Sequence, residues 1–270
     1  MSASAGGAAR EPEVEERGEE QEAEGLTFID HLHELRRRLI VTVLSVAIGA
    51  GLTFGFAEEM VHILMQPVLD ALPEGQKQLA FLSLLEKVFV YLRVSVYGGV
   101  FVMTPILLYQ LWAFIAPGLY ARERKVVAPF LFFGTLMFVG GGVFCYFLIL
   151  PNAFAFLLDF GGAADWTMPV LTLKDQLSLV LMLELAFGVI FEIPVVIAFL
   201  ALIGVVDAAL LSSYRRHAVV VVTIAAAVIT PTGDPFNLAL MAVPMYVFYE
   251  VGIVLAWIIG RKRKEEEAEA

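Results

Sequence analysis

Long apolar stretches separated by short polar segments dominate the chain from residue 39 onward. There are six of these stretches, at residues 39–57, 88–114, 126–150, 176–203, 218–230 and 236–260. A helix needs about 20 apolar residues to cross the hydrocarbon core of a bilayer. The pattern therefore predicts an all-α polytopic membrane protein with six transmembrane helices.

The last two stretches depart from an ordinary span. Residues 218–230 number only 13 and are followed by Pro231-Thr-Gly-Asp-Pro235. A helix of that length measures about 20 Å, against about 30 Å for the hydrocarbon core. The sixth stretch contains Pro244, which removes a helical hydrogen bond. We expect spans five and six to be short or kinked.

Two amphipathic segments flank the first span. In residues 27–38, Thr27 and Asp30 have the spacing of a capping box, which predicts an interfacial helix before the span. A second short helix is expected along the outer interface, ending at Pro73. Its apolar positions are Val61, Leu64, Val68 and Leu72.

The third stretch contains a run of small residues, Gly140-Gly-Gly142, and is followed by Pro151. Glycine lets the backbone of a second helix approach closely, because no side chain separates the two helices. We therefore expect a tight helix crossing at this run. Pro151 is expected to end the third span.

Charge is distributed unevenly along the chain. The formal net charge is -10, but eight glutamates lie within residues 11–24. We predict a disordered acidic tail over residues 1–25, a membrane domain over 26–260 and a basic-then-acidic cytoplasmic tail over 261–270. With both termini cytoplasmic, 14 of the 18 lysines and arginines lie inside. The outer ones are Lys77, Lys87, Arg93 and Lys174. This bias follows the positive-inside rule.

Composition makes several kinds of site improbable. The single cysteine, Cys145, precludes an intrachain disulfide or a cysteine-rich metal centre, and the four histidines are dispersed. We expect no catalytic site, cofactor, metal or nucleic-acid partner. The first 25 residues lack the apolar core of a secretory signal.

Two carboxylates are predicted to lie on the same cytoplasmic surface. Glu34 precedes Arg36, Arg37 and Arg38, and Glu123 stands between Arg122 and Arg124. A guanidinium docks on a carboxylate through parallel charge-assisted hydrogen bonds, so the two acids suit a ligand that carries two cations. Alternatively, each acid pairs only with its neighbouring arginines.

Glu184 and Glu192 lie two turns apart on one face of the fourth stretch. Acids at membrane depth are costly unless they face a polar cavity or a hydrogen-bonding partner. One interpretation is a hydrated groove or a contact with a partner helix, and the other is a protonated or hydrogen-bonded packing contact. Buried acids also keep open a proton-coupled small-molecule transporter and, with less support, an intramembrane hydrolase.

Four stretches together resemble the TatC family, the multispanning receptor of the twin-arginine protein translocase. They are Phe28-Ile-Asp-His-Leu-His-Glu-Leu-Arg-Arg-Arg38, residues 105–124 with the core Tyr109-Gln-Leu-Trp-Ala-Phe-Ile-Ala-Pro-Gly-Leu-Tyr120, Phe191-Glu-Ile-Pro-Val195, and residues 230–246. The resemblance implies a protein of the bacterial cytoplasmic membrane that binds twin-arginine signal peptides. It also implies homo-oligomers and single-span partners of the TatA and TatB type, which together export folded proteins using the proton-motive force.

The resemblance also implies roles for individual residues. Glu34 and Glu123 match the positions that recognise the arginine pair. Phe114, Pro117, Tyr120 and Arg124 would complete that site. Glu192 matches a membrane-embedded acid of the fourth span, and Asp234 an acid on the outer side. Here the chain reads Thr-Pro-Thr-Gly-Asp where the family pattern is Thr-Pro-Pro-Asp, and the family pattern has no acid at Glu184.

Overall fold

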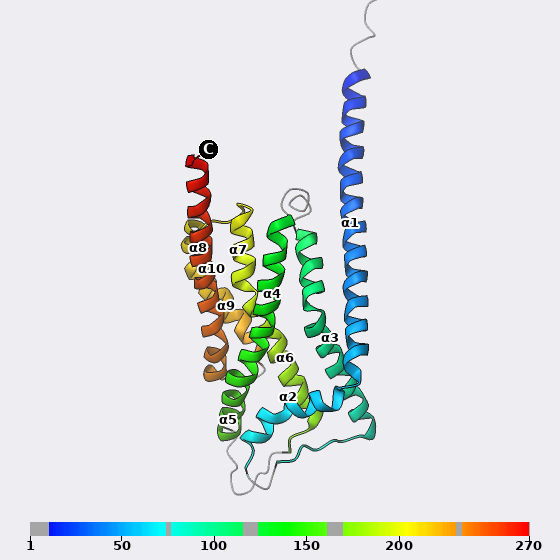
Figure 1. Ribbon diagram of the computed structural model, residues 1–270, viewed down its shortest axis with the longest axis vertical. Helices are drawn as coiled ribbons and strands as arrows, with labels where there is room; N and C mark the ends of the chain where they lie inside the picture. Colours follow the sequence, from blue (N-terminus) through cyan, green and yellow to red (C-terminus); the bar gives the residue numbers. More distant parts are fainter. Residues whose placement is uncertain (1–10, 74–76, 116–123, 161–169, 231–233, 270) are drawn as a thin grey trace, which may run out of the picture.

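The computed structural model describes residues 11–73, 77–115, 124–160, 170–230 and 234–269. In these residues the chain is helical, apart from the connections and one isolated β-bridge between Ala80 and Thr172. Most helices stand side by side in a bundle, and one short helix lies across an end of it (Figure 1).

The helices follow one another in this order: α1 (Glu11–Phe54), α2 (Ala57–Ala71), α3 (Leu84–Ile115), α4 (Arg124–Phe144), the π-helix η1 (Cys145–Ile149), α5 (Leu150–Phe160), α6 (Leu173–Phe191), α7 (Ile193–Leu202), α8 (Ala208–Ser213), α9 (Arg215–Ile229) and α10 (Pro235–Glu269).

Five helical segments of the described chain are long and apolar enough to cross a membrane. They are Leu32–Phe54, Leu84–Phe114, Ala128–Asp159, Leu173–Leu202 and Pro235–Arg261. The remaining predicted span corresponds to α9, which has only 15 residues. Its length is about 22 Å at 1.5 Å per residue, so the prediction of a short fifth span is confirmed.

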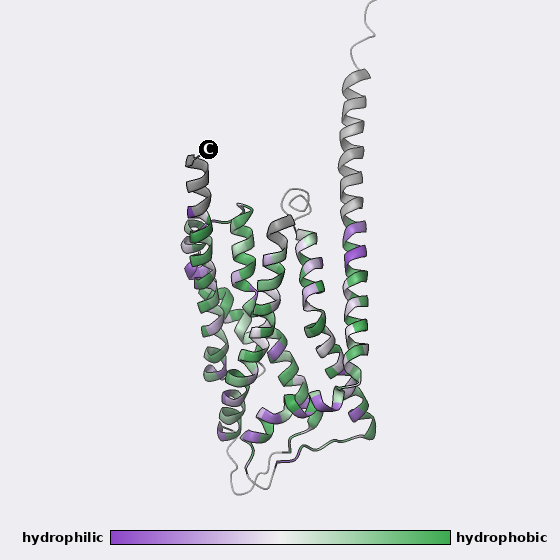
Figure 2. Ribbon diagram, viewed as in Figure 1, coloured by the Kyte–Doolittle hydropathy of each residue, from purple (hydrophilic) through white to green (hydrophobic). Residues whose placement is uncertain are grey.

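The two ends of the bundle differ in the segments they carry. The start of α1 and the end of α10 lie at one end, together with the end of α3 and the start of α4 (Figure 1). We call this the cytoplasmic end, following the distribution of lysine and arginine. The opposite, outer end carries α2. Between the two ends the helices are largely apolar (Figure 2).

Helix α2 closes the outer end of the bundle, as its amphipathic pattern predicts. Leu64, Met65 and Val68 are buried and belong to the main hydrophobic core. That core continues through Val90 and Val94 of α3 and then into η1 and α6. The helix ends at Ala71, with Leu72 as its C-cap directly before Pro73.

Glycines permit two close helix crossings. A Cβ atom at Gly99 of α3 would lie 2.5 Å from the backbone nitrogen of Ala50 in α1. At Gly141 of α4, a Cβ atom would overlap the backbone carbonyl of Phe187 in α6. The tight crossing predicted from Gly140-Gly-Gly142 is therefore confirmed, with Gly141 at the contact. Gly140 itself faces open space.

Helix α1 differs from its predicted division. It runs without a break from Glu11 to Phe54, so residues 27–38 are not a separate interfacial helix. Its one proline, Pro12, lies in the first turn, where the missing N–H has no helical partner, and glutamate, glutamine and alanine are good helix formers. The helix begins within the predicted disordered tail. No helix begins or ends at residue 26 or at residue 260, so these limits of the membrane domain stay a prediction.

The third span continues past Pro151, so the prediction that this proline ends it is wrong. The π-helix η1 precedes α5, and Pro151 lies in the first turn of α5. In a π-helix each N–H bonds to the carbonyl five residues earlier instead of four. This change in the hydrogen-bond pattern accommodates Pro151, which has no N–H to donate. The side-chain amide of Asn152 donates to the carbonyl of Leu148 at 2.6 Å.

The fourth span is divided by a helix break at Glu192. This residue is the C-cap of α6 and the N-cap of α7, and Pro194 occupies the first turn of α7. Proline fits the first turn because its absent N–H would have no helical partner there. In contrast, Pro105 lies within the continuous α3 and Pro244 within the continuous α10.

Candidate functional site

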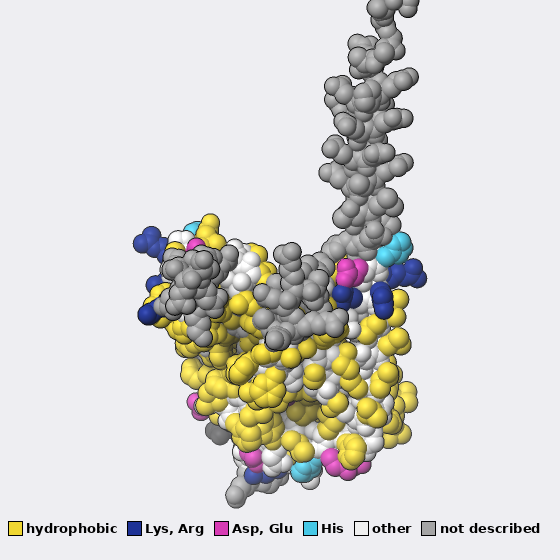
Figure 3. Space-filling view, turned by 45° about the horizontal axis from the view of Figure 1, so that its top comes forward, with side chains coloured by type: hydrophobic (Ala, Val, Ile, Leu, Met, Phe, Trp, Pro, Cys, Tyr) yellow, Lys and Arg dark blue, Asp and Glu magenta, His cyan; other side chains and the backbone are white. Residues whose placement is uncertain are grey.

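Glu34 lies on α1 at the cytoplasmic end, where the helix leaves the apolar belt. Its side chain is 33% exposed and forms an ion pair with Arg38 one turn later. The Nε of Arg38 donates to Oε1 of Glu34 at 3.0 Å. Charged side chains gather around this part of α1 above the hydrophobic surface (Figure 3). The carboxylate is therefore paired with a guanidinium of its own helix.

A second helix contributes to this site. Nη1 of Arg38 lies 3.4 Å from Oε1 of Gln110 in α3, which is a long hydrogen bond. A pocket of about 260 Å³ separates the two helices here. It is lined by Glu34, Arg37, Arg38, Val41, Tyr109 and Gln110. We call this the Glu34 pocket.

The remaining predicted residues of this site follow directly along the chain. Phe114 is half-buried and lies one turn after Gln110, near the end of α3. Pro117, Tyr120 and Glu123 lie outside the described residues. Arg124 begins α4 at the cytoplasmic end, but its side chain is also outside the described part. That Glu123 joins Glu34 in one site therefore stays a prediction.

An aromatic cluster holds the end of α3 in place. The ring of Trp112 packs against Phe199 of α7 at 4.4 Å between centroids and against Phe130 of α4 at 6.4 Å. Leu108 and Val195 complete the buried cluster. Because Gln110 lies between Leu108 and Trp112 in sequence, this packing fixes the α3 side of the Glu34 pocket.

Glu192 is buried at the break between α6 and α7, with 7% of its surface exposed. Neither carboxylate oxygen has a hydrogen-bond partner among the described residues. A Cβ atom at Gly134 of α4 would lie 3.2 Å from Oε2 and 3.0 Å from a methyl of Leu108. The absence of a side chain at Gly134 therefore makes room for the carboxylate between α3 and α4.

Glu184 has a different environment, although it lies on the same face of the span. It is 4% exposed and accepts a hydrogen bond from the hydroxyl of Tyr97 in α3. Of the two interpretations for the buried acids, the hydrogen-bonded packing contact therefore holds for Glu184. Tyr97 was not identified from the sequence as the partner of Glu184. The available signal was a hydroxyl group within an otherwise apolar stretch.

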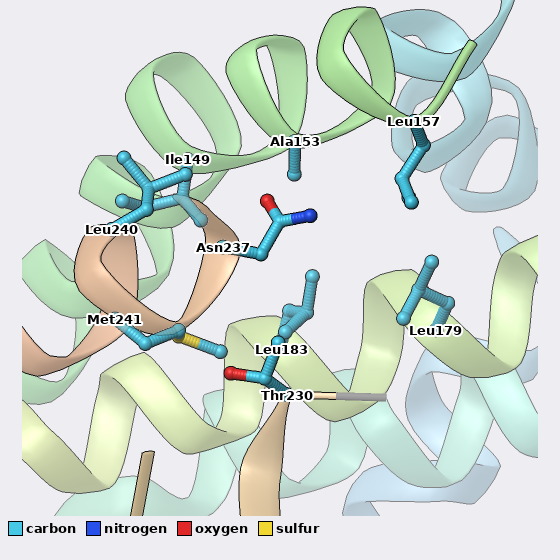
Figure 4. A pocket seen from close by; sticks show the side chains of 9 residues that line it. All are labelled: Ile149, Ala153, Leu157, Leu179, Leu183, Thr230, Asn237, Leu240 and Met241. Atoms are coloured by element: carbon cyan, nitrogen blue, oxygen red, sulfur yellow. The ribbon is translucent and has the colours of Figure 1, made fainter. Parts of the chain in front are cut away.

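Asp234 caps the outer end of α10. Its Oδ1 accepts from the backbone N–H of Asn237 at 2.7 Å, and its Oδ2 accepts from the side-chain amide of the same residue at 2.9 Å. Asn237 in turn lines a small cavity of about 20 Å³ beside Thr230 and Ala153 (Figure 4). The observed contacts give Asp234 a structural role at the connection between α9 and α10.

Another charged contact, not foreseen in the sequence, joins the last two helices. Nη2 of Arg215 in α9 lies 2.8 Å from Oε2 of Glu250 in α10, and the hydroxyl of Tyr246 donates to Oε1 of Glu250 at 2.8 Å. In this ion pair, as in the one between Arg38 and Glu34, the structure describes both side chains. Each joins a glutamate and an arginine in the cytoplasmic half of the bundle.

Comparisons with known proteins identify the family. A family model described as Sec-independent protein translocase protein (TatC) matches residues 30–244. The TatC protein of Koribacter versatilis is 37% identical over 262 residues, covering 96% of each chain. That of Aquifex aeolicus is 38% identical over 240 residues, covering 89% of this chain and 98% of the relative.

A solved structure agrees with the sequence comparisons. The crystal structure of a twin-arginine translocase receptor, TatC, is 37% identical, with a TM-score of 0.74, and covers 85% of this chain and 99% of that one. These findings give no support to the alternative of a small-molecule transporter. The chain belongs to the TatC family of Sec-independent protein translocase proteins and is a multi-pass protein of the cytoplasmic membrane.

Proposed function

We propose that this chain recognises the arginine pair of twin-arginine signal peptides at the Glu34 pocket, as a receptor rather than a catalyst. The observation that carries the proposal is the contact between Glu34 and Arg38 at the cytoplasmic end. A carboxylate that pairs with a guanidinium while remaining one-third exposed supports this role. Glu123 is proposed as the second acid, with Phe114, Pro117, Tyr120 and Arg124 around it.

Binding of a peptide arginine requires Arg38 to give up Glu34. Gln110 offers an alternative acceptor, because its Oε1 already lies 3.4 Å from Nη1 of Arg38. A small rotation of the Arg38 side chain would strengthen that bond and leave Glu34 open. One guanidinium then replaces another on the same carboxylate, so the exchange costs little charge–charge energy.

Magnitudes show that the arginine pair alone does not explain tight binding. Two charge-assisted contacts contribute about 3 to 6 kcal/mol, whereas micromolar affinity requires about 8 kcal/mol. The difference must come from burial of the apolar part of the signal peptide. The two acids therefore set the discrimination between peptides more than their overall attachment to the membrane.

We further propose that single-span subunits of the TatA and TatB type assemble beside the short helix α9, in a receptor complex containing several copies of this chain. One face of α9 is apolar and exposed, with Val220, Val221, Ile224 and Val228 each more than half exposed. A helix shorter than the hydrocarbon core favours local thinning of the bilayer. Such thinning next to a docked subunit would suit export of folded proteins driven by the proton-motive force.

Site-specific photo-crosslinking in native membranes tests the receptor proposal. A crosslinker placed at Phe114 should capture a twin-arginine signal peptide and lose most of that capture with a twin-lysine peptide. The same probe at Val102, an exposed position in the middle of α3, serves as the control.

Matched variants then assign the discrimination. Glu34→Gln should bring capture of the twin-arginine peptide down to that of the twin-lysine peptide. Glu59→Gln, in the first turn of α2 at the outer end, should leave the difference intact. Equal capture of both peptides by the unmodified chain would exclude arginine recognition at this site.

A further inference from the structure

A second binding surface lies at the outer half of the bundle, between α3 and α6. Two adjoining cavities of about 650 and 440 Å³ open there, and Phe89 and Arg93 line both. Together they form one continuous feature, which we call the outer groove. It lies in the opposite half of the bundle from the Glu34 pocket and plays no part in the proposed recognition of signal peptides.

The two parts of the outer groove differ in chemistry. The mouth carries four charged side chains, Glu86, Arg93, Lys174 and Asp175, beside apolar ones. The deeper part is lined mainly by apolar side chains, including Leu92, Val96, Val100, Leu181 and Leu185. Charged groups therefore meet an apolar channel at a single boundary, close to Arg93.

The cations at the mouth have unused hydrogen-bonding capacity. Arg93 is exposed and its Nη1 donates to the hydroxyl of Ser178 at 2.8 Å, one bond for a group with five N–H donors. Lys174 is also exposed. Within the described chain neither cation forms an ion pair with a carboxylate. An anionic oxygen-rich group, such as a phosphate, complements this pair.

The nearby acid Glu86 is occupied by the backbone instead. Its Oε2 accepts from the N–H of Leu82 at 2.9 Å and its Oε1 from the N–H of Lys174 at 3.2 Å. The bond from Lys174 ties the start of α3 to the start of α6, and the bond from Leu82 is local to the start of α3. Glu86 is therefore a positioning residue for the mouth rather than a partner for Arg93.

The apolar part has the length of one lipid leaflet. Along α3 it extends from Phe89 to Val100, and on α6 it is lined from Ser178 to Leu185. The distance along α3 is about 16 Å at 1.5 Å per residue, against about 15 Å for half of the hydrocarbon core. At its inner end lies Tyr97, whose hydroxyl is already bound to Glu184. The floor thus offers no unsatisfied polar group to an apolar chain.

We propose that the outer groove binds one glycerophospholipid of the outer leaflet. The phosphate lies between Arg93 and Lys174, and one acyl chain follows the seam between α3 and α6 down to Tyr97. A partner helix fits this surface less well, because its apolar side chains would have to cover the charged mouth. A phospholipid matches both parts of the groove, because its phosphate suits the charged mouth and its acyl chain suits the apolar channel.

A photoreactive lipid tests the proposal. The full-length purified chain is placed in vesicles containing a phosphatidylethanolamine with a diazirine in the middle of one acyl chain, and the adducts are mapped by peptide mass spectrometry. We expect adducts concentrated at Val96 and Leu185 that saturate with lipid concentration. Excess unlabelled phospholipid should remove them, whereas inorganic phosphate should not. Val96→Trp, which fills the channel, should abolish them.

Charge variants test the headgroup contact. Arg93→Gln and Lys174→Gln should each lower the groove adducts about tenfold, because each removes a charge-assisted hydrogen bond to the phosphate. Lys77→Gln, an exposed cation of the outer loop away from the groove, serves as the matched control and should have no effect. Adducts on the exposed face of α1, at Ile48 and Leu52, report that each variant is still inserted normally.

Two results would overturn the proposal. One is labelling of the groove no stronger than that of α1 and unchanged by the charge variants, which would leave only general lipid contact. The other is capture of a protein instead of lipid by a crosslinker at Val96 in native membranes, which would assign the groove to a partner helix.

Discussion

At the scale of single residues, the two buried acids show how strongly tertiary contacts decide the role of a side chain. Glu184 and Glu192 lie on one helical face and cannot be distinguished by sequence periodicity. Only the structure shows that Tyr97 of α3 reaches Glu184, whereas Glu192 has Gly134 and Leu108 as neighbours. Whether a buried acid has a hydrogen-bond donor depends on residues far away in the sequence, 87 positions in the case of Tyr97 and Glu184.

The contact between Tyr97 and Glu184 leads to a stability prediction. Tyr97→Phe removes the hydroxyl and leaves a buried carboxyl group without its donor, which should lower the free energy of unfolding by about 1 to 3 kcal/mol. Thermal unfolding of the detergent-solubilised protein measures the loss. Adding Glu184→Leu to Tyr97→Phe should recover most of it, because no polar group is then left unpaired. An unchanged melting temperature for Tyr97→Phe would show that the hydrogen bond contributes nothing.

The ion pair at the Glu34 pocket leads to a prediction for binding. Arg38 competes with the peptide for Glu34, and an exposed pair of this kind contributes about 0.2 to 1 kcal/mol. Arg38→Gln should therefore strengthen binding of a twin-arginine peptide by up to about fivefold. Fluorescence anisotropy with a labelled peptide measures the affinity.

Arg37→Gln is the matched control for this measurement. Arg37 lines the same pocket and carries the same charge but is not the ion-pair partner of Glu34. Its loss should not strengthen binding. If Arg38→Gln weakened binding as much as Arg37→Gln or more, Arg38 would be a ligand for the peptide backbone or an organiser of the pocket instead of a competitor.

At the scale of helices, the sequence predicts the number and order of the spans, because most spans appear as apolar stretches of about 20 or more residues. It does not predict how individual helices are interrupted. The break at Glu192 and the π-helix at Cys145–Ile149 each depend on which carbonyls find donors in the packed bundle. Pro105, Pro151 and Pro194 look alike in sequence, but only Pro194 accompanies a helix break.

The crossing of α4 and α6 provides a test at this scale. Gly141→Ala places a methyl group against the backbone of Phe187 and should destabilise the protein by about 1 to 3 kcal/mol. Gly140→Ala adds the same methyl one residue earlier, where nothing lies within 4 Å. That change should be neutral or slightly stabilising, because alanine favours the helix. Equal melting temperatures for the two variants would contradict the close approach.

At the scale of the whole molecule, the uneven lengths of the spans define where the bundle is thinnest. Most of the candidate spans exceed the length needed to cross the bilayer, whereas α9 has 15 residues. The sequence predicts this shortness directly, since Arg215-Arg216-His217 precedes the apolar stretch and Pro231 follows it. The predicted proximity of Glu34 and Glu123 is a different case. It depends on the conformation of the connection between α3 and α4, which a periodic sequence pattern does not predict.

If the short span thins the bilayer for export, lengthening it should impair transport. Inserting five leucines into the middle of α9 adds about 7.5 Å, which brings the helix to about the thickness of the hydrocarbon core. Export of a folded reporter with a twin-arginine signal peptide should then fall severalfold, while the amount of the chain in the membrane stays the same. Peptide capture at Phe114 should persist, because the Glu34 pocket lies on α1 and α3.

The control keeps the length of α9 and changes only its composition. Leucine replaces the exposed residues Val219, Val220, Val221, Ile224 and Val228, which raises the leucine content by the same number without extending the helix. Export should remain close to that of the unmodified chain, since the side chains stay apolar and the span stays short. If the lengthened variant exported normally, thinning at α9 would be excluded. If both variants failed alike, the β-branched surface of α9 rather than its length would be what the partner subunits require.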